Sequence, residues 1–338
     1  KPRTFWPNTK IKGKITSPIY VIDNKNMFKN KDELKGKALL IDKKIVKKYN
    51  NPFGVMQEIT ALDTQIDAVI INYDNRKDGV YSISRSIRHD EGYNNDDGPI
   101  ILYCTDEVSS EIKTGADSGN KIDISVNYSF EDVEVPNVIG MLTGTDEDLK
   151  DEFIIIGAHL DHVGDNMNGT YNPGAYDNAS GISGLLETAK VLNNNEMKPK
   201  KSILFIAFNG EEEYLYGSRY YVENPIYPLD KSILINLDCI GVKTDVPLEL
   251  DYNSTVSKDL VDKFYELANE LKMDCKQVNN GAGDHKHFDE KGVQSVLLID
   301  WDSFTLHTIK DTVENAISEE RLEKTIKLIL YYLDKNAY

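Results

Sequence analysis

FIIIGAHLDH, residues 153–162, places an apolar run directly before a cluster of histidine and aspartate. A short run of β-branched residues without polar alternation is typical of a buried strand in a parallel sheet. SILFIAF at 202–208 and ILINL at 233–237 have the same character, and each also leads into acidic residues. Ligands of open α/β sheets bind outside the carboxyl ends of the strands. The polar residues that follow these runs are therefore predicted to meet at one edge of a sheet.

The polar residues in question are of types that bind metals. YDNASG at 176–181 and LHTIKDT at 306–312 add another aspartate and another histidine to those that follow the runs. The candidates are His159, Asp177, Glu211, Glu212, Asp238 and His307. Carboxylate oxygens and imidazole nitrogens suit zinc. Acids beside strand ends can instead be solvated loop residues, but that alternative explains one such segment better than it explains five in this order.

The number of candidates predicts two metal ions rather than one. A catalytic zinc takes three protein ligands and keeps one position open, so five ligands exceed its needs. Two ions that share one carboxylate use five ligands, and such pairs lie about 3.5–4 Å apart. Glu211 adjoins a presumed ligand and remains outside the set, which makes it the candidate general base for hydrolysis.

The order of the motifs resembles a known family. H-x-D, DNxSG, EE followed by GS, LD and HTxxDT stand here as they do in the co-catalytic two-zinc aminopeptidases of peptidase family twenty-eight in clan MH. The resemblance covers the chain from about Asn137 to its C-terminus. It implies an α/β fold, with a three-layer zinc-peptidase core built on a mixed, largely parallel sheet.

The resemblance also implies a role for each candidate. Asp177 would bridge two zinc ions per chain. His159 and Asp238 would share one ion, and Glu212 and His307 the other. Glu211 would act as the base, taking a proton from the attacking water and later passing it to the leaving amine.

Other polar residues are expected to support this site. Asp161 lies two residues after His159 on an extended segment and could accept the free ring N–H, as carboxylates beside metal-bound histidines do, although a loop-capping role is the alternative. Asp311 could do the same for His307, with turn capping equally open. His162 is expected not to bind a metal. Metal binding by the two histidines of GAGDHKHF, at 285 and 287, is the lesser alternative to a place near the substrate.

The sequence departs from the family pattern at two positions. Tyr176 stands where the family usually has asparagine, so packing around the bridging aspartate is expected to differ. Leu306 replaces a tyrosine whose hydroxyl can steady the developing oxyanion, so that donor must come from elsewhere or the zinc ions carry the charge. The family further implies a cis peptide between Asp177 and Asn178.

Composition limits the classes of partner. The chain has 338 residues and a net charge of −17, which argues against nucleic acid or an anionic membrane as partner. No apolar stretch approaches the roughly 20 residues of a membrane helix. The start, KPRTFWPNTK, does not resemble a signal peptide, so the chain is either cytoplasmic or processed. Secretion or a periplasmic location is implied only by the family.

Two domains are expected from the length. Residues 1–135 resemble a β-rich protease-associated domain, with short strands at 17–23, 35–42, 66–74 and 98–104 and a polar stretch at 82–97. Residues 136–338 form the predicted catalytic domain, in which NVIGML is the first strand. Apolar stripes at helical spacing predict helices over 180–192, over 257–272 and after Ser318, a good N-cap.

The resulting hypothesis is a zinc aminopeptidase that acts on peptides with a free N-terminus. A carboxypeptidase of the same clan is one alternative, and it would need a basic residue such as Arg219 to hold a substrate carboxylate. A glutaminyl cyclase is another, but it works with a single zinc. A receptor-like relative without metal would have lost the ligands, whereas all five candidates and the base are present here.

Overall fold

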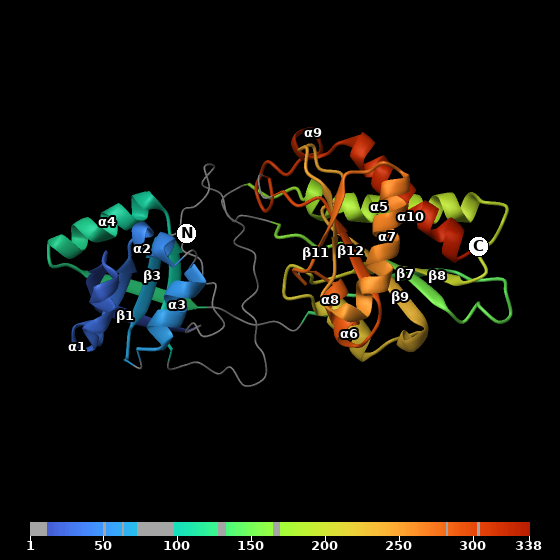
Figure 1. The fold of residues 1–338 in the computed structure, drawn as a ribbon. Coiled ribbons are helices and arrows are strands. Elements are labelled where there is room, and N and C mark those ends of the chain that lie inside the picture. Colours follow the sequence, from blue (N-terminus) through green and yellow to red (C-terminus); the bar gives the residue numbers. More distant parts are fainter. Residues whose placement is uncertain are drawn as a thin grey trace. The chain divides into compact units, whose positions relative to one another are not determined.

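The computed structural model describes residues 12–49, 52–62, 64–72, 98–127, 133–164, 170–281, 283–302 and 305–338. The polar stretch at 82–97 therefore lies outside the described residues. The chain divides into two compact units, the second of which runs from Val133 to Tyr338 (Figure 1). Each unit has its own sheet.

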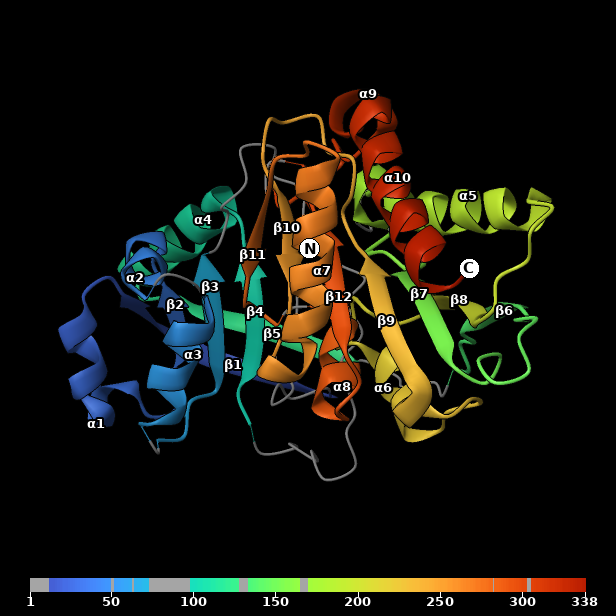
Figure 2. The ribbon, with the colours of Figure 1, turned by 45° about the vertical axis from the view of Figure 1, so that its right-hand side comes forward.

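The second unit is built on a seven-stranded sheet with the order β11-β10-β12-β9-β7-β8-β6 (Figure 2). The strands are β6 Val138–Leu142, β7 Phe153–His159, β8 Ser202–Phe208, β9 Ser232–Leu237, β10 Leu248–Asp251, β11 Cys275–Val278 and β12 Ser295–Ile299. Four neighbouring pairs are parallel, and only β6 with β8 and β10 with β12 are antiparallel. The three apolar runs that the sequence singled out form the adjacent strands β8, β7 and β9, so their carboxyl ends share one edge.

Helices cover both faces of this sheet. They are α5 Ser180–Asn194, α6 Tyr216–Glu223, α7 Lys258–Glu270, α8 His285–Glu290, α9 Val313–Ala316 and α10 Glu319–Asn336, with short turns at Ala175–Ala179, Leu229–Lys231 and Thr255–Ser257. Residues of α5, α7 and α10 pack in one hydrophobic cluster with the sheet, and residues of α6 and α8 pack in another. The three-layer α/β core with a largely parallel sheet is thus confirmed.

Strand β7 shows how this layering places the site. All seven of its residues are buried, because helices cover the sheet on both sides. Ile154 and Ile156 belong to the cluster that contains α5, whereas Phe153 and Ile155 belong to the cluster that contains α6 and α8. Side chains alternate between faces along a strand. His159, the last residue of β7, therefore leaves the sheet on the α6 and α8 side.

The first unit contains a five-stranded sheet with the order β4-β3-β2-β1-β5. Its strands are β1 Lys12–Ile22, β2 Ala38–Ile41, β3 Ala68–Asn72, β4 Ile100–Cys104 and β5 Lys121–Asn127, and its helices are α1 Lys31–Leu34, α2 Lys43–Lys48, α3 Pro52–Thr60 and α4 Asp106–Asp117, with a turn at Lys25–Lys29. The four strands expected from the sequence are present and parallel to one another, and antiparallel β5 and the helices were not anticipated.

The predicted helices of the second unit are confirmed as α5, α7 and α10. Ser318 caps α10, since its hydroxyl accepts a hydrogen bond from the N–H of Arg321 at 3.4 Å. No helix in the described part of the chain is both long and apolar enough to cross a membrane.

Candidate metal centre

The carboxyl edge of the seven-stranded sheet gathers the candidate ligands. His159 ends β7, Asp238 directly follows β9, and Asp177 lies just before α5. Glu212 follows β8, and His307 lies beyond the end of β12. Residues far apart in the sequence thereby form two groups of possible ligands, and within each group the ligand atoms lie within 4.8 Å of one another.

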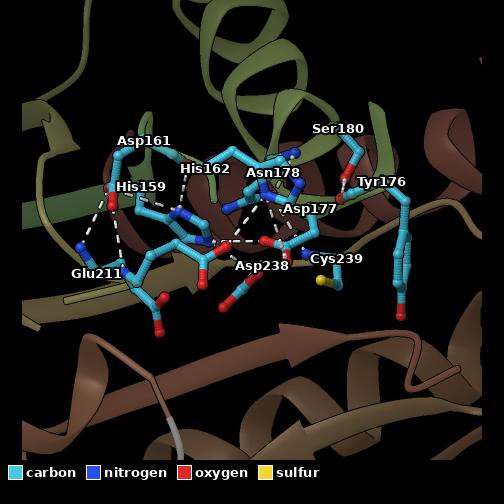
Figure 3. Close-up of polar contacts among 12 residues, drawn as sticks. His159, Asp161, His162, Tyr176, Asp177, Asn178, Ser180, Glu211, Asp238 and Cys239 are labelled. Carbon is cyan, nitrogen blue, oxygen red and sulfur yellow. Dashed lines mark hydrogen bonds and ion pairs between the residues drawn. The ribbon is translucent and has the colours of Figure 1, made fainter. Parts of the chain in front are cut away.

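The first group consists of His159, Asp177 and Asp238, all of them buried. The Nε2 atom of His159 lies 3.3 Å from Oδ1 of Asp177 and 3.3 Å from Oδ1 of Asp238. Figure 3 shows the imidazole directed between the two carboxylates. Two carboxylates and one imidazole nitrogen thus face a common point.

The second group consists of His162, Asp177, Glu212 and His307. Nε2 of His307 lies 2.9 Å from Oδ2 of Asp177 and 3.1 Å from Oε1 of Glu212. Asp177 directs Oδ1 toward the first group and Oδ2 toward the second, and it is the one residue common to both. This arrangement is the one that a bridging carboxylate requires.

His162, which was expected not to bind a metal, lies in the second group of possible ligands. Its Nδ1 atom is 3.0 Å from Oε1 of Glu212 and 3.7 Å from Oδ2 of Asp177. The only sequence signal is its place three residues after His159, in the segment without regular secondary structure that follows β7. The contact with Glu212 suits a hydrogen bond that orients this carboxylate.

Hydrogen bonds hold the loop that carries Asp177. The Asp177–Asn178 peptide is cis, as the family resemblance implied. The side chain of Asn178 donates to the carbonyl of Leu237 at 2.9 Å and accepts from the N–H groups of Gly181 and Cys239. A Cβ atom on Gly181 would lie 2.5 Å from the carbonyl oxygen of Leu237, so no larger residue fits. The DNxSG motif thus ties the Asp177 loop to the end of β9.

Asp161 supports the site through different atoms from those expected. Nδ1 of His159 faces the backbone carbonyl of Asp161 at 3.1 Å, whereas the carboxylate oxygen Oδ1 is 3.7 Å away. The carboxylate accepts the backbone N–H groups of Glu211 and Glu212, at 3.1 and 3.2 Å (Figure 3). The residue therefore orients the histidine with its main chain and the glutamate pair with its side chain.

A turn at Gly210 presents both glutamates. The φ angle of Gly210 is +75°, a left-handed conformation that glycine adopts without steric cost, and its carbonyl accepts the N–H of Tyr216 at 2.8 Å. Consecutive side chains on an extended strand would point to opposite sides. The turn explains how Glu211 and Glu212 can both face the edge of the sheet.

Asp311 contacts the Asp177 loop, a role that neither expected alternative, orienting His307 or capping a turn, had included. Its carboxylate accepts the N–H of Tyr176 at 2.7 Å and the N–H of Asp177 at 3.1 Å. Its backbone carbonyl accepts the N–H of Ala175. Three consecutive N–H groups of the loop therefore depend on the segment that follows His307.

Replacing Asp311 with alanine is expected to destabilise the protein and loosen the bridging position. Two buried backbone N–H groups would lose their acceptors, which costs about 2–4 kcal/mol in total. Urea unfolding of Asp311→Ala and Asp311→Asn measures this, with the asparagine variant expected to lose about half as much because it keeps one acceptor oxygen. Equal unfolding free energies for wild type and Asp311→Ala would contradict the assignment.

The electrostatics of the centre favour a cation. Burial raises the pKa of the Glu211 carboxyl well above its usual range. Burial lowers the pKa of His307, but hydrogen bonds to Asp177 and Glu212 outweigh this effect and raise the pKa to about 9. Four carboxylates and three imidazoles meet here, so the acids outnumber the groups that could neutralise them. Buried charge is costly unless it is paired or binds a metal, and this donor set fits zinc.

The two histidines of α8 lie outside both groups. His285 is fully buried, and His287 contacts Glu290 at 3.1 Å. Neither belongs to a possible metal-binding group among the described residues. Leu306, whose apolar side chain has no hydrogen-bond donor, packs beside a buried cluster that contains Tyr176 and Cys239.

The comparison with protein-family models identifies one family. The profile described as Peptidase family M28 matches residues 137–333. "Aminopeptidase YwaD" of Bacillus subtilis is 33% identical over 53% of this chain and 40% of its own length. "Glutamate carboxypeptidase 2 homolog" of Caenorhabditis elegans is 28% identical over 49% of this chain and 21% of its own length.

The fold has solved counterparts as well. The structure of BSAP, a zinc aminopeptidase from Bacillus subtilis, aligns with 97% of this chain and 77% of its own, with a TM-score of 0.73 and 24% identity. At this identity the likeness concerns the fold. The chain spans less than half the length of the two curated relatives named above.

Proposed function

Because this chain belongs to peptidase family M28, we propose that it is a two-zinc aminopeptidase that removes N-terminal residues from peptides. The observation that carries the proposal is the position of Asp177, whose two oxygens face separate groups of ligands. A single-zinc site would not need a carboxylate shared in this way.

Five residues would hold the two ions. His159 and Asp238 would bind one, Glu212 and His307 the other, and Asp177 would bridge them. His162 would orient Glu212 through Nδ1. Zinc bound by these residues would lower the pKa of a water ligand and polarise the scissile carbonyl.

Glu211 is the proposed general base. Its side chain is partly buried and interacts electrostatically with His159 and Asp238, which places it beside the first group of ligands. A general base must lie close to the water from which it takes the proton. Glu211 would accept a proton from water and donate it to the amine that leaves. Asp161, which holds the N–H groups of both glutamates, would keep the base in position.

The alternative activities differ in what they require of the site. A carboxypeptidase needs a cation for the substrate carboxylate, and the candidate Arg219 lies on α6 with its guanidinium over the ring of Tyr216. A glutaminyl cyclase would use one zinc, which leaves the first group of ligands without a purpose. The arrangement therefore supports the aminopeptidase best.

A panel of aminoacyl fluorogenic substrates tests this function. We expect hydrolysis of substrates with a free amine and none of their N-acetylated counterparts, because an exopeptidase of this kind acts only at a free N-terminus. A chelator should abolish the activity, and added zinc should restore it. Hydrolysis of the acetylated substrates, or activity that survives chelation and dialysis, would refute the proposal.

The N-terminal unit is proposed to be a protease-associated domain that guides substrate, and the enzyme is proposed to work outside the cytoplasm. Both proposals rest on the family resemblance. Deletion of residues 1–132 tests the first, since loss of activity on long peptides with retained activity on dipeptide substrates would support a guiding role. Fractionation of source cells tests the second.

A further inference from the structure

The hydroxyl of Tyr176 makes a pair of hydrogen bonds that has no part in the mechanism proposed above. Its side chain is fully buried, and its ring points away from the metal ligands (Figure 3). The hydroxyl donates to the carbonyl of Asp300 at 2.5 Å and accepts the N–H of Asp302 at 3.0 Å. The hydroxyl thus acts both as donor and as acceptor, and both of its partners belong to the backbone of residues 300–302.

The residue between these two contacts is Trp301, which is 52% exposed. It leaves the sheet at the end of β12, which is parallel to β9, the strand that leads to Asp238. The same segment leads on to His307. Trp301 therefore stands at the edge of the sheet where the ligands gather, and both peptides that flank it are fixed by one hydroxyl.

The two residues next to Trp301 make further hydrogen bonds, but these involve their side chains and not the two peptide groups that flank Trp301. The carboxylate of Asp300 accepts from Arg321 at 2.8 Å and from the N–H of Gly241 at 2.7 Å. The hydroxyl of Thr244 donates to the carboxylate of Asp302 at 2.8 Å. These bonds hold side chains, whereas the carbonyl before Trp301 and the N–H after it both meet Tyr176. Because hydrogen bonds hold the backbone on both sides of Trp301, its exposed indole is suited to form a contact surface of fixed position.

We propose that Tyr176 is a positioning residue whose hydroxyl fixes the backbone around Trp301, so that the indole forms a preset wall for the substrate. This inference rests on the proposed function for the identity of the substrate. It assigns separate tasks to the two halves of Tyr176. The backbone N–H, held by Asp311, belongs to the Asp177 loop, and the hydroxyl belongs to substrate binding.

The test uses the full chain with Trp6 replaced by phenylalanine, so that Trp301 is the only tryptophan. In this background, Tyr176→Phe removes the hydroxyl and keeps the buried ring. We expect acrylamide to quench Trp301 more strongly and its fluorescence anisotropy to fall. We also expect KM to rise about fivefold or more, the scale of one lost hydrogen bond, while kcat stays within about twofold and zinc content does not change.

Tyr221→Phe is the matched control. Tyr221 is also a buried tyrosine, but its hydroxyl has no hydrogen-bond partner within the described residues. It should leave quenching, KM and kcat unchanged. If Tyr176→Phe behaves like this control, or if it lowers kcat and zinc content with an unchanged KM, the proposal is wrong.

Trp301→Ala separates the proposal from the proposed function. The KM effects of Tyr176→Phe and Trp301→Ala should not add, because the hydroxyl acts through the indole. Full additivity would overturn the positioning role. The quenching result needs no catalysis, so it decides whether the hydroxyl fixes Trp301 even if the chain hydrolyses none of the substrates.

Discussion

Replacing Asp177 with alanine should remove both zinc ions and abolish peptide hydrolysis. The two oxygens of Asp177 face His159 at 3.3 Å and His307 at 2.9 Å, so this carboxylate is the one ligand that both ions would share. Removing a shared ligand weakens both sites, whereas Asp238 contacts only the first group. Asp238→Ala is therefore the matched control and should lose mainly one ion.

Elemental analysis of metal-saturated protein measures this directly. Wild type should bind two zinc ions per chain, Asp238→Ala about one and Asp177→Ala close to none under the same dialysis. Circular dichroism should show that both variants remain folded. A stoichiometry of one for wild type, or equal retention of zinc by the two variants, would rule out the bridging role.

Glu211→Gln should lower kcat by at least about 10²-fold, the usual scale for a lost general base, while zinc content stays nearly intact. Glutamine keeps the size and hydrogen-bonding shape of the side chain but cannot accept the proton. The base is therefore separable from the ligands. Active-site titration with a tight-binding inhibitor would normalise kcat to the metal-loaded fraction.

Glu212→Gln is the control for this experiment because it changes the adjacent residue in the same way. Oε1 of Glu212 lies 3.1 Å from Nε2 of His307 in the second group, so we expect reduced zinc affinity. An amide oxygen is a poorer zinc ligand than a carboxylate. If Glu211→Gln lost zinc and Glu212→Gln kept it, the two roles would have to be exchanged.

The core strands and main helices could be predicted from local sequence. The runs at 153–157, 202–208 and 233–237 are long enough and apolar enough that strands buried on both faces are the structure that accommodates them. The stripe after Ser318 predicts an amphipathic helix with its N-cap. Less apolar elements such as β5 and β11 depend on their neighbours for burial and escaped prediction.

The candidate ligands could likewise be named from the sequence, because residue types and their place after strands carry metal chemistry. The sequence did not indicate which atoms of these residues contact one another. His162 and Asp161 illustrate this. A backbone carbonyl rather than a carboxylate receives Nδ1 of His159, and the second histidine of HLDH turns toward Glu212. Such details depend on how the segment after β7 bends, which the strand pattern does not determine.

The sequence by itself determined the α/β class, the strands that share an edge and the identity of the residues at that edge. Only the tertiary structure decided that the two oxygens of Asp177 serve different groups, and that Tyr176 turns its hydroxyl toward the peptides around Trp301. The physical reason is the distance along the sequence over which each kind of interaction acts. Local periodicity reflects burial within one element, whereas the hydroxyl contacts of Tyr176 join residues more than 120 positions apart and depend on the packing of the whole sheet edge.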